Sequence, residues 1–172
     1  MCDLLIERGA SWCGTNAYGC GAAHWLALRR DGSEAACEWL VQRGADASHA
    51  VWRAPNIAGH TPLHKAATRG SLTCMRWLLH HAALNALEVD AADADGNTAL
   101  ALAALWGQRC AAEQLLSAGA SVDAVGFGGC TPLVWSLAMG HGHVAALLRE
   151  RGAGEAAAAA CGLMRRGDCL AG

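Results

Sequence analysis

Leucine-rich stretches that close with a pair of small residues recur along the chain. The pairs are Gly9-Ala10, Gly44-Ala45, Ala82-Ala83, Gly119-Ala120 and Gly152-Ala153. Successive pairs lie 35, 38, 37 and 33 residues apart. A period of this length is typical of a repeat protein, in which stacked units bury a continuous apolar core. The pattern predicts one helix in each unit, ending near the pair.

A second signature predicts another helix start in the same units. Glycine is followed two residues later by threonine at 59–61, 96–98 and 129–131, and Pro62 and Pro132 come next. A threonine hydroxyl accepts from a backbone N–H of the first turn, and proline at the first helical position gives up a donor that has no partner there. Glycines then fall where this helix should end, at Gly32, Gly70, Gly107 and Gly140. Each unit is therefore predicted to be helix, turn, helix and loop.

Composition agrees with helices and narrows the classes of partner. The chain is 53% hydrophobic, with one Tyr and one Phe, and its formal net charge is −2. No global positive field favours nucleic acid or an anionic membrane surface. No stretch approaches the roughly 20 apolar residues of a membrane span. The first residues also lack the basic and apolar run of a secretory signal.

Motifs for metal, cofactor and catalysis are missing from the sequence. There is no Cys-x-x-Cys, His-Glu-x-x-His, Gly-x-Ser-x-Gly or phosphate-loop pattern. We therefore expect no enzyme, no metal and no cofactor. The nine cysteines are odd in number and no Asn-x-Ser/Thr site occurs. They favour reduced thiols and a cytoplasmic or nuclear location.

The signatures at 59–67 and 129–133 resemble the ankyrin repeat, whose Thr-Pro-Leu-His-x-Ala pattern is complete from Thr61 through Pro62, Leu63 and His64. The resemblance implies an all-α ankyrin-repeat solenoid, with stacked helix-turn-helix units joined by β-hairpin-like fingers. The expected ankyrin-repeat domain covers 1–153, with a half repeat at 1–13 and repeats at about 14–46, 54–84, 91–121 and 124–153. For the Ala-rich tail, 154–172, a makeshift capping helix and a disordered segment are both left open.

The resemblance also implies structural roles for the motif residues. Thr61 and His64 should join the first helix of their repeat to its neighbours by hydrogen bonds. In the later repeats Thr98, Thr131 and Pro132 retain the motif residues at the start of the first helix. Ala101 and Val134 replace the motif histidine, so those two junctions are expected to rely more on packing.

Two long loops depart from the repeat period. The extra residues fall between Gly44 and Gly59 and between Ala82 and Gly96. Insertions in a solenoid project from one face, often the binding face. Candidate contacts there are Trp52, Arg53, Glu88 and Asp90. Tolerated growth of a surface loop is the alternative.

Position within the repeat sorts the remaining candidates. Trp25, Trp39, Trp77 and Trp135 are predicted to pack in the core, whereas for Trp106 partner contact and packing are both open. The concave face of the first helices is expected to carry His60, Thr68, Arg69, Asn97, Leu105, Cys130 and Met139. An ordinary solvated face is the alternative for each of them.

The family resemblance implies binding of another protein, as an adaptor or scaffold. The alternatives are a structural spacer within a larger array and a substrate-recruiting arm of a ubiquitin ligase complex. No nucleic-acid, membrane or small-molecule partner is expected. The sequence points to no particular partner protein.

Overall fold

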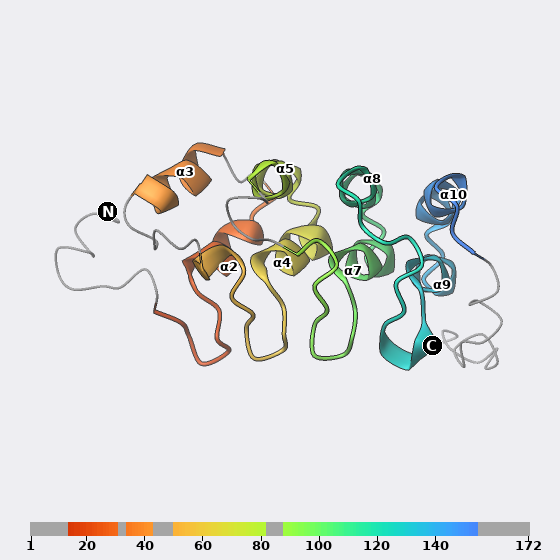
Figure 1. Cartoon of the computed structure of the whole chain (residues 1–172), viewed down its shortest axis with the longest axis horizontal. Helices are drawn as coiled ribbons and strands as arrows, with labels where there is room; N and C mark the ends of the chain where they lie inside the picture. Colours follow the sequence, from red (N-terminus) through yellow and green to blue (C-terminus); the bar gives the residue numbers. More distant parts are fainter. Residues whose placement is uncertain (1–13, 31–33, 43–49, 82–87, 155–172) are drawn as a thin grey trace.

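A computed structural model describes residues 14–30, 34–42, 50–81 and 88–154, which form four consecutive helix pairs (Figure 1). The α-helices are α2 (Ala22–Ala27), α3 (Glu34–Gln42), α4 (Pro62–Arg69), α5 (Leu72–His80), α7 (Ala99–Leu105), α8 (Arg109–Ser117), α9 (Pro132–Ala138) and α10 (Gly142–Glu150). Two short 3-10 helices are η1 (Ala50–Trp52) and η2 (Phe127–Gly129). Within these residues the only strand-like pairing is one isolated bridge between Ala92 and Thr98.

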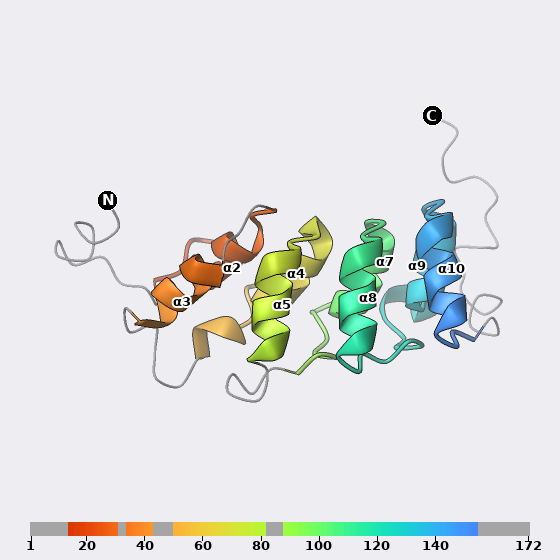
Figure 2. The same ribbon diagram turned by 90° about the horizontal axis from the view of Figure 1, so that it is seen from above.

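The first helices α2, α4, α7 and α9 form one row, and the second helices α3, α5, α8 and α10 form another above it (Figure 1). The pairs follow one another along the solenoid (Figure 2). Loops extend from the starts of the first helices, as the finger arrangement predicts (Figure 1). The expected all-α solenoid is confirmed. The half repeat 1–13 and the tail beyond Gly154 lie outside the described residues.

Threonine and glycine set the limits of the first helices as predicted. The Thr98 hydroxyl accepts from Ala101 N at 3.3 Å, and the Thr131 hydroxyl accepts from Val134 N at 3.5 Å. Gly70 ends α4 with φ 67° and ψ 37°, a left-handed backbone that glycine adopts without the clash of a Cβ atom. The turns after α4, α7 and α9 each contain a glycine with a left-handed backbone, at Gly70, Gly107 and Gly140, and lead directly into the second helix.

The core consists mainly of small and branched side chains. Ala66, Ala67, Ala103 and Ala104 are fully buried, because adjacent first helices pack closely. Leucines fill the larger spaces between the two rows, at Leu63, Leu78, Leu100, Leu115, Leu133 and Leu148. Apolar area of this kind stabilises the stack by about 25 cal/mol for each Å² removed from water.

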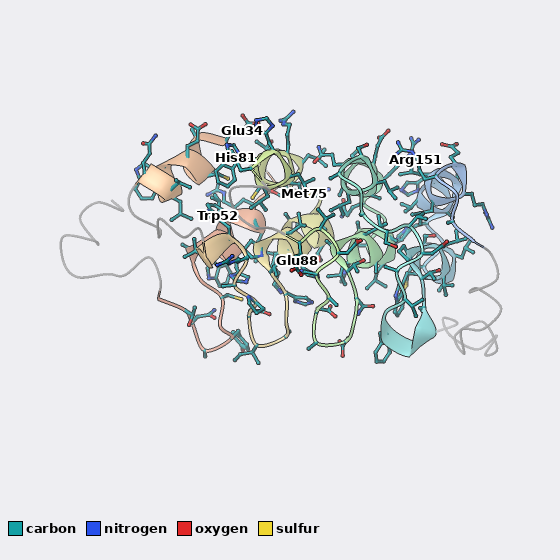
Figure 3. All side chains as sticks on the ribbon, viewed as in Figure 1. Glu34, Trp52, Met75, His81, Glu88 and Arg151 are labelled. Carbon is teal, nitrogen blue, oxygen red and sulfur yellow. The ribbon has the colours of Figure 1, made fainter. Side chains whose placement is uncertain are left out.

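Trp52, expected to be exposed on the first long loop, is instead buried, so that prediction is wrong. Its side chain, labelled in Figure 3, has 0% exposure. Its ring centroid lies 4.8 Å from that of Trp77, and the two ring planes are tilted by 47°. Trp77 in turn stacks on His81, with centroids 4.5 Å apart. Within this loop Ala50–Trp52 form η1, which places an aromatic ring against α5. The described part of the insertion thus adds Trp52 to the core, while Arg53 beside it is exposed.

Trp25 also differs from its prediction, because 56% of it is exposed. Its counterpart in the third repeat, Leu102, is buried between neighbouring helices. Trp25 lies in the first described helix pair, where it lines an apolar pocket with Leu26, Trp39 and Leu40. Within the described residues no further helix pair covers this end, which explains the exposure.

Candidate functional site

Imidazole side chains join successive repeats near the starts of the first helices. His24 Nε2 donates to His60 O at 2.9 Å, and His64 Nε2 donates to Asn97 O at 3.2 Å. Thr61 N donates to His64 Nδ1 at 3.2 Å, so both ring nitrogens of His64 are used. Burial is the main cause that lowers the pKa of His24 and of His64. The joining imidazoles are therefore mainly neutral at pH 7. The bonds of His64 to Thr61 and Asn97 are of the kind that the resemblance implied.

A different set of bonds joins the repeats at the turns after the first helices. Gln108 Nε2 donates to Thr68 O at 3.4 Å, and His141 Nε2 donates to Leu105 O at 3.1 Å. His143 Nε2 donates to Gly107 O, also at 3.1 Å. Each donor lies at or near the start of a second helix and reaches back to the preceding repeat. These bonds hold the turns in a fixed conformation.

Trp106 lies between the two carbonyls that His141 and His143 bind. It is the C-terminal cap of α7, and 58% of its surface is exposed. The residue that follows, Gly107, has a left-handed backbone with φ 66°. An exposed tryptophan is thus presented on a turn whose neighbouring carbonyls are both bound.

Arg69, Trp106 and Met139 occupy the same position in three consecutive repeats, immediately before the left-handed glycine of the turn. We call these three residues the turn row. All are exposed, Met139 to 43%. Beside them Thr68 and Leu105 are partly buried, and the Thr68 hydroxyl donates to His64 O at 2.8 Å. The structure therefore brings together the exposed members of the expected concave face in one row.

Asn97 and Cys130 do not line this face, because both are buried. Asn97 Oδ1 accepts from Phe127 N at 3.2 Å, so the side chain holds the next finger in place. The Cys130 side chain is fully buried, and its Sγ lies 3.9 Å from Gly128 O. Free thiols occur at Cys20, Cys37, Cys74 and Cys110.

His60 is partly buried and links the side chains of Lys65 and Asp93. Lys65 Nζ donates to His60 Nδ1 at 3.0 Å, while His60 Nε2 lies 3.2 Å from Asp93 Oδ2. Burial and then the charge of Lys65 lower the pKa of His60, and Asp93 opposes this shift. Both ring nitrogens are therefore engaged within the protein.

The candidate contacts of the long loops are divided among different roles. Arg53 and Glu88 are exposed, whereas Trp52 is buried. Both carboxylate oxygens of Asp90 accept from Ser121 N at 3.0 Å, which joins one loop to the next. The structure therefore does not assemble the four predicted loop residues into one exposed surface.

Charge differs between the loops before α7 and α9 and the turns after the first helices. The loops 88–98 and 121–131 contain no Lys or Arg but carry Glu88, Asp90, Asp93, Asp95 and Asp123. The turns 68–72, 105–109 and 138–142 contain no Asp or Glu but carry Arg69 and Arg109. The turn edge is therefore cationic although the whole chain has a charge of −2.

Metal and membrane features are not found in the described part of the chain. No group of three or more His, Cys, Asp or Glu side chains converges there as a metal site. Of the helices in that part, none combines the length and the apolar character needed to span a bilayer.

Residues 24–126 match the family described as ankyrin repeats in three copies. The chain belongs to the ankyrin-repeat family. Ankyrin repeats are in general non-catalytic modules of protein–protein interaction. Their partner is set by the side chains of the particular surface rather than by the fold.

Two known relatives are each 33% identical to this chain. One is Palmitoyltransferase AKR1 of Lachancea kluyveri, aligned over 130 residues, which is 76% of this chain and 17% of the relative. The other is Neurogenic locus notch homolog protein 1 of Xenopus tropicalis, aligned over 139 residues, which is 81% of this chain and 5% of the relative. The chain thus spans less than a fifth of the length of either protein.

Several exposed residues on the ankyrin surface were not singled out from the sequence. Tyr18, Ile57 and Phe127 are exposed at the tips of the first, second and fourth fingers. Arg109 and His143 flank Trp106 at the turn edge. Their spacing from the repeat glycines could have identified them, because residues just before a finger glycine or just after a turn glycine recur with the period of the repeat.

Proposed function

We propose that this ankyrin-repeat domain is a non-catalytic adaptor or scaffold that binds another protein along the turn edge, in the cytoplasm or nucleus. The observation that carries the proposal is Trp106, exposed on a turn whose flanking carbonyls are bound by His141 and His143. Tryptophan is enriched among residues that dominate binding energy at interfaces.

Packing does not explain a tryptophan at this position. The same place in neighbouring repeats holds Arg69 and Met139, which differ from Trp106 in charge, shape and rigidity. The ankyrin stack therefore accepts unrelated side chains here. An aromatic ring that the stack does not need, held on an ordered turn, supports a role in binding.

A spacer role within a larger polypeptide is the second candidate. Trp25, Leu26, Trp39 and Leu40 form an apolar pocket at the α2–α3 end, and the equivalent surfaces of inner repeats pack against neighbouring repeats. The relatives are also much longer than this chain. A ubiquitin-ligase arm remains a narrower form of the adaptor proposal.

Affinity capture from a lysate of the source cell separates the two candidates. The full chain is immobilised beside a Trp106→Ala/Met139→Ala variant and a Trp25→Ala variant, and the melting temperature of each is measured. The adaptor proposal expects a partner that the wild type and Trp25→Ala retain and the turn variant loses. Loss in Trp25→Ala alone supports stacking at the α2–α3 end. A partner that all three proteins retain equally overturns the turn-edge proposal.

A further inference from the structure

The turn row changes its chemistry along the solenoid. Arg69, after α4, presents an exposed cation, whereas Trp106 and Met139, after α7 and α9, present exposed apolar groups. Because α4, α7 and α9 lie side by side in this order (Figure 2), the positions at the ends of these helices follow one another in the same order. The surface is therefore cationic at one end and apolar at the other.

Electrostatic asymmetry favours a partner that carries carboxylates. At α7, which is seven residues long, the acidic loop 88–98 and the turn that carries Arg109 lie at opposite ends. Arg69 ends the neighbouring helix α4, whose loop 50–61 carries Arg53 and no Asp or Glu. At 1.5 Å per residue the separation along α7 is about 10 Å, similar to the Debye length at physiological salt. An acidic group is attracted to the Arg69 and Arg109 edge and repelled from the loops that carry Asp93 and Asp95.

The spacing of the row limits the shape of the bound segment. Packed helices lie about 8–10 Å apart, and an extended segment in the polyproline II conformation advances about 3.1 Å per residue with three residues per turn. Neighbouring members of the row therefore match side chains three positions apart in such a segment, because these side chains share one face. In an α-helix the same step needs about seven residues.

We infer that the partner binds through an extended acidic-apolar segment, a deduction that rests on the proposed function. One Asp or Glu of the segment faces Arg69, and apolar side chains three and six positions away face Trp106 and Met139. The rigid indole gives the first apolar contact its shape, and the flexible thioether of Met139 adapts to the second. The turn bonds from His141 and His143 lower the ordering cost on binding.

Selection from a random library of 12-residue peptides on phage tests this inference without assuming a sequence. The library is panned on the full wild-type chain after depletion on Trp106→Ala. Enriched peptides are synthesised with fluorescein, and their dissociation constants are measured by fluorescence anisotropy. Trp25→Ala is the control for Trp106→Ala, because the two tryptophans have almost equal exposure. Arg53→Ala is the control for Arg69→Ala, since Arg53 is an exposed arginine of a loop.

The expected peptides carry an acidic residue three positions from an apolar one. Trp106→Ala should weaken their binding by about 30-fold, the effect typical of an interface hot spot. Arg69→Ala should weaken it by about 3- to 10-fold, with a smaller effect at high salt. Arg69→Glu should favour peptides in which the acidic residue is replaced by Lys. Neither control variant should change binding by more than about twofold.

Three results would overturn the inference: no enrichment, enriched peptides without the acidic residue, or equal binding by wild type and Arg69→Glu. The capture experiment then shows which claim has failed. If captured protein still depends on Trp106, the binding role stands and the acidic-apolar chemistry is wrong. If capture is also independent of Trp106, both claims fail.

Discussion

Trp52 and Trp106 show two different ways in which this chain uses a tryptophan. Trp52 lies in an inserted loop, yet its ring is buried against Trp77. Trp106 lies at a regular turn of the repeat, yet more than half of it is exposed. The first is held by aromatic packing, whereas the turn around the second is held by imidazole–carbonyl hydrogen bonds from His141 and His143. The insertion, which departs from the repeat pattern, therefore adds Trp52 to the core, whereas a position that follows the pattern carries the candidate contact Trp106.

Removing the buried ring should have the largest effect on stability. Trp52→Ala is expected to lower the free energy of unfolding by about 3–5 kcal/mol, because it empties a fully buried site beside Trp77. Trp52→Phe keeps an aromatic ring and should cost less. Urea unfolding followed by circular dichroism measures both. A loss below about 1 kcal/mol for Trp52→Ala would contradict the assignment of η1 to the core.

Removing a buried imidazole should have an intermediate effect. His64→Ala leaves Asn97 O and Thr61 N without their bonds, and is expected to cost about 2–3 kcal/mol. The exposed His80 supplies the control, since His80→Ala should change stability by less than about 0.5 kcal/mol. Equal unfolding midpoints for the two variants would show that the motif histidine contributes only packing.

Acidification should weaken the imidazole bonds while leaving the packing around Trp52 intact. Burial lowers the folded-state pKa of His24, His60 and His64 below the ordinary value of about 6.5. The unfolded chain then binds protons more readily than the folded one, so stability is full above about pH 6.5 and falls as the pH drops below it. The melting temperature should decrease between pH 7.5 and 5.5, and less steeply in His64→Ala. If the melting temperature of His64→Ala falls with pH as steeply as that of the wild type, His64 does not contribute to the pH dependence of stability.

Loosening the turn beside Trp106 should have the smallest effect on global stability. His141→Ala and His143→Ala each remove one bond to a partly exposed turn and should cost about 0.5–1 kcal/mol. Hydrogen exchange at residues 106–108 should become faster, while exchange in α4 stays the same. Unchanged exchange at the turn would show that Gly107 alone determines its conformation.

The repeat period predicted the helix pairs and the turn row because both follow from local signals. Thr61-Pro62 begins α4 and Gly70 ends it, as expected, and Arg69, Trp106 and Met139 take equivalent positions. Trp52 was misassigned because an insertion has no equivalent in other repeats, so no register shows whether it folds back onto the core.

Other errors have their own physical causes. Asn97 and Cys130 precede the helix-starting threonines, where the side chain turns inward to the next finger or the core. Trp25 has a core register but lies at an end of the described stack. The net charge of the chain also did not predict that the loops are acidic and the turns cationic, because a net charge does not show where the charged residues lie.

The central claim is that the turn edge around Trp106 is the binding surface, and a hydrogen-exchange footprint of the captured complex tests it most directly. Exchange is measured on the full chain with and without its captured partner. The account predicts slower exchange at residues 103–109 and 136–142, with little change at 88–98 and 121–131. Protection confined to those loops, or to α2 and α3, would contradict it.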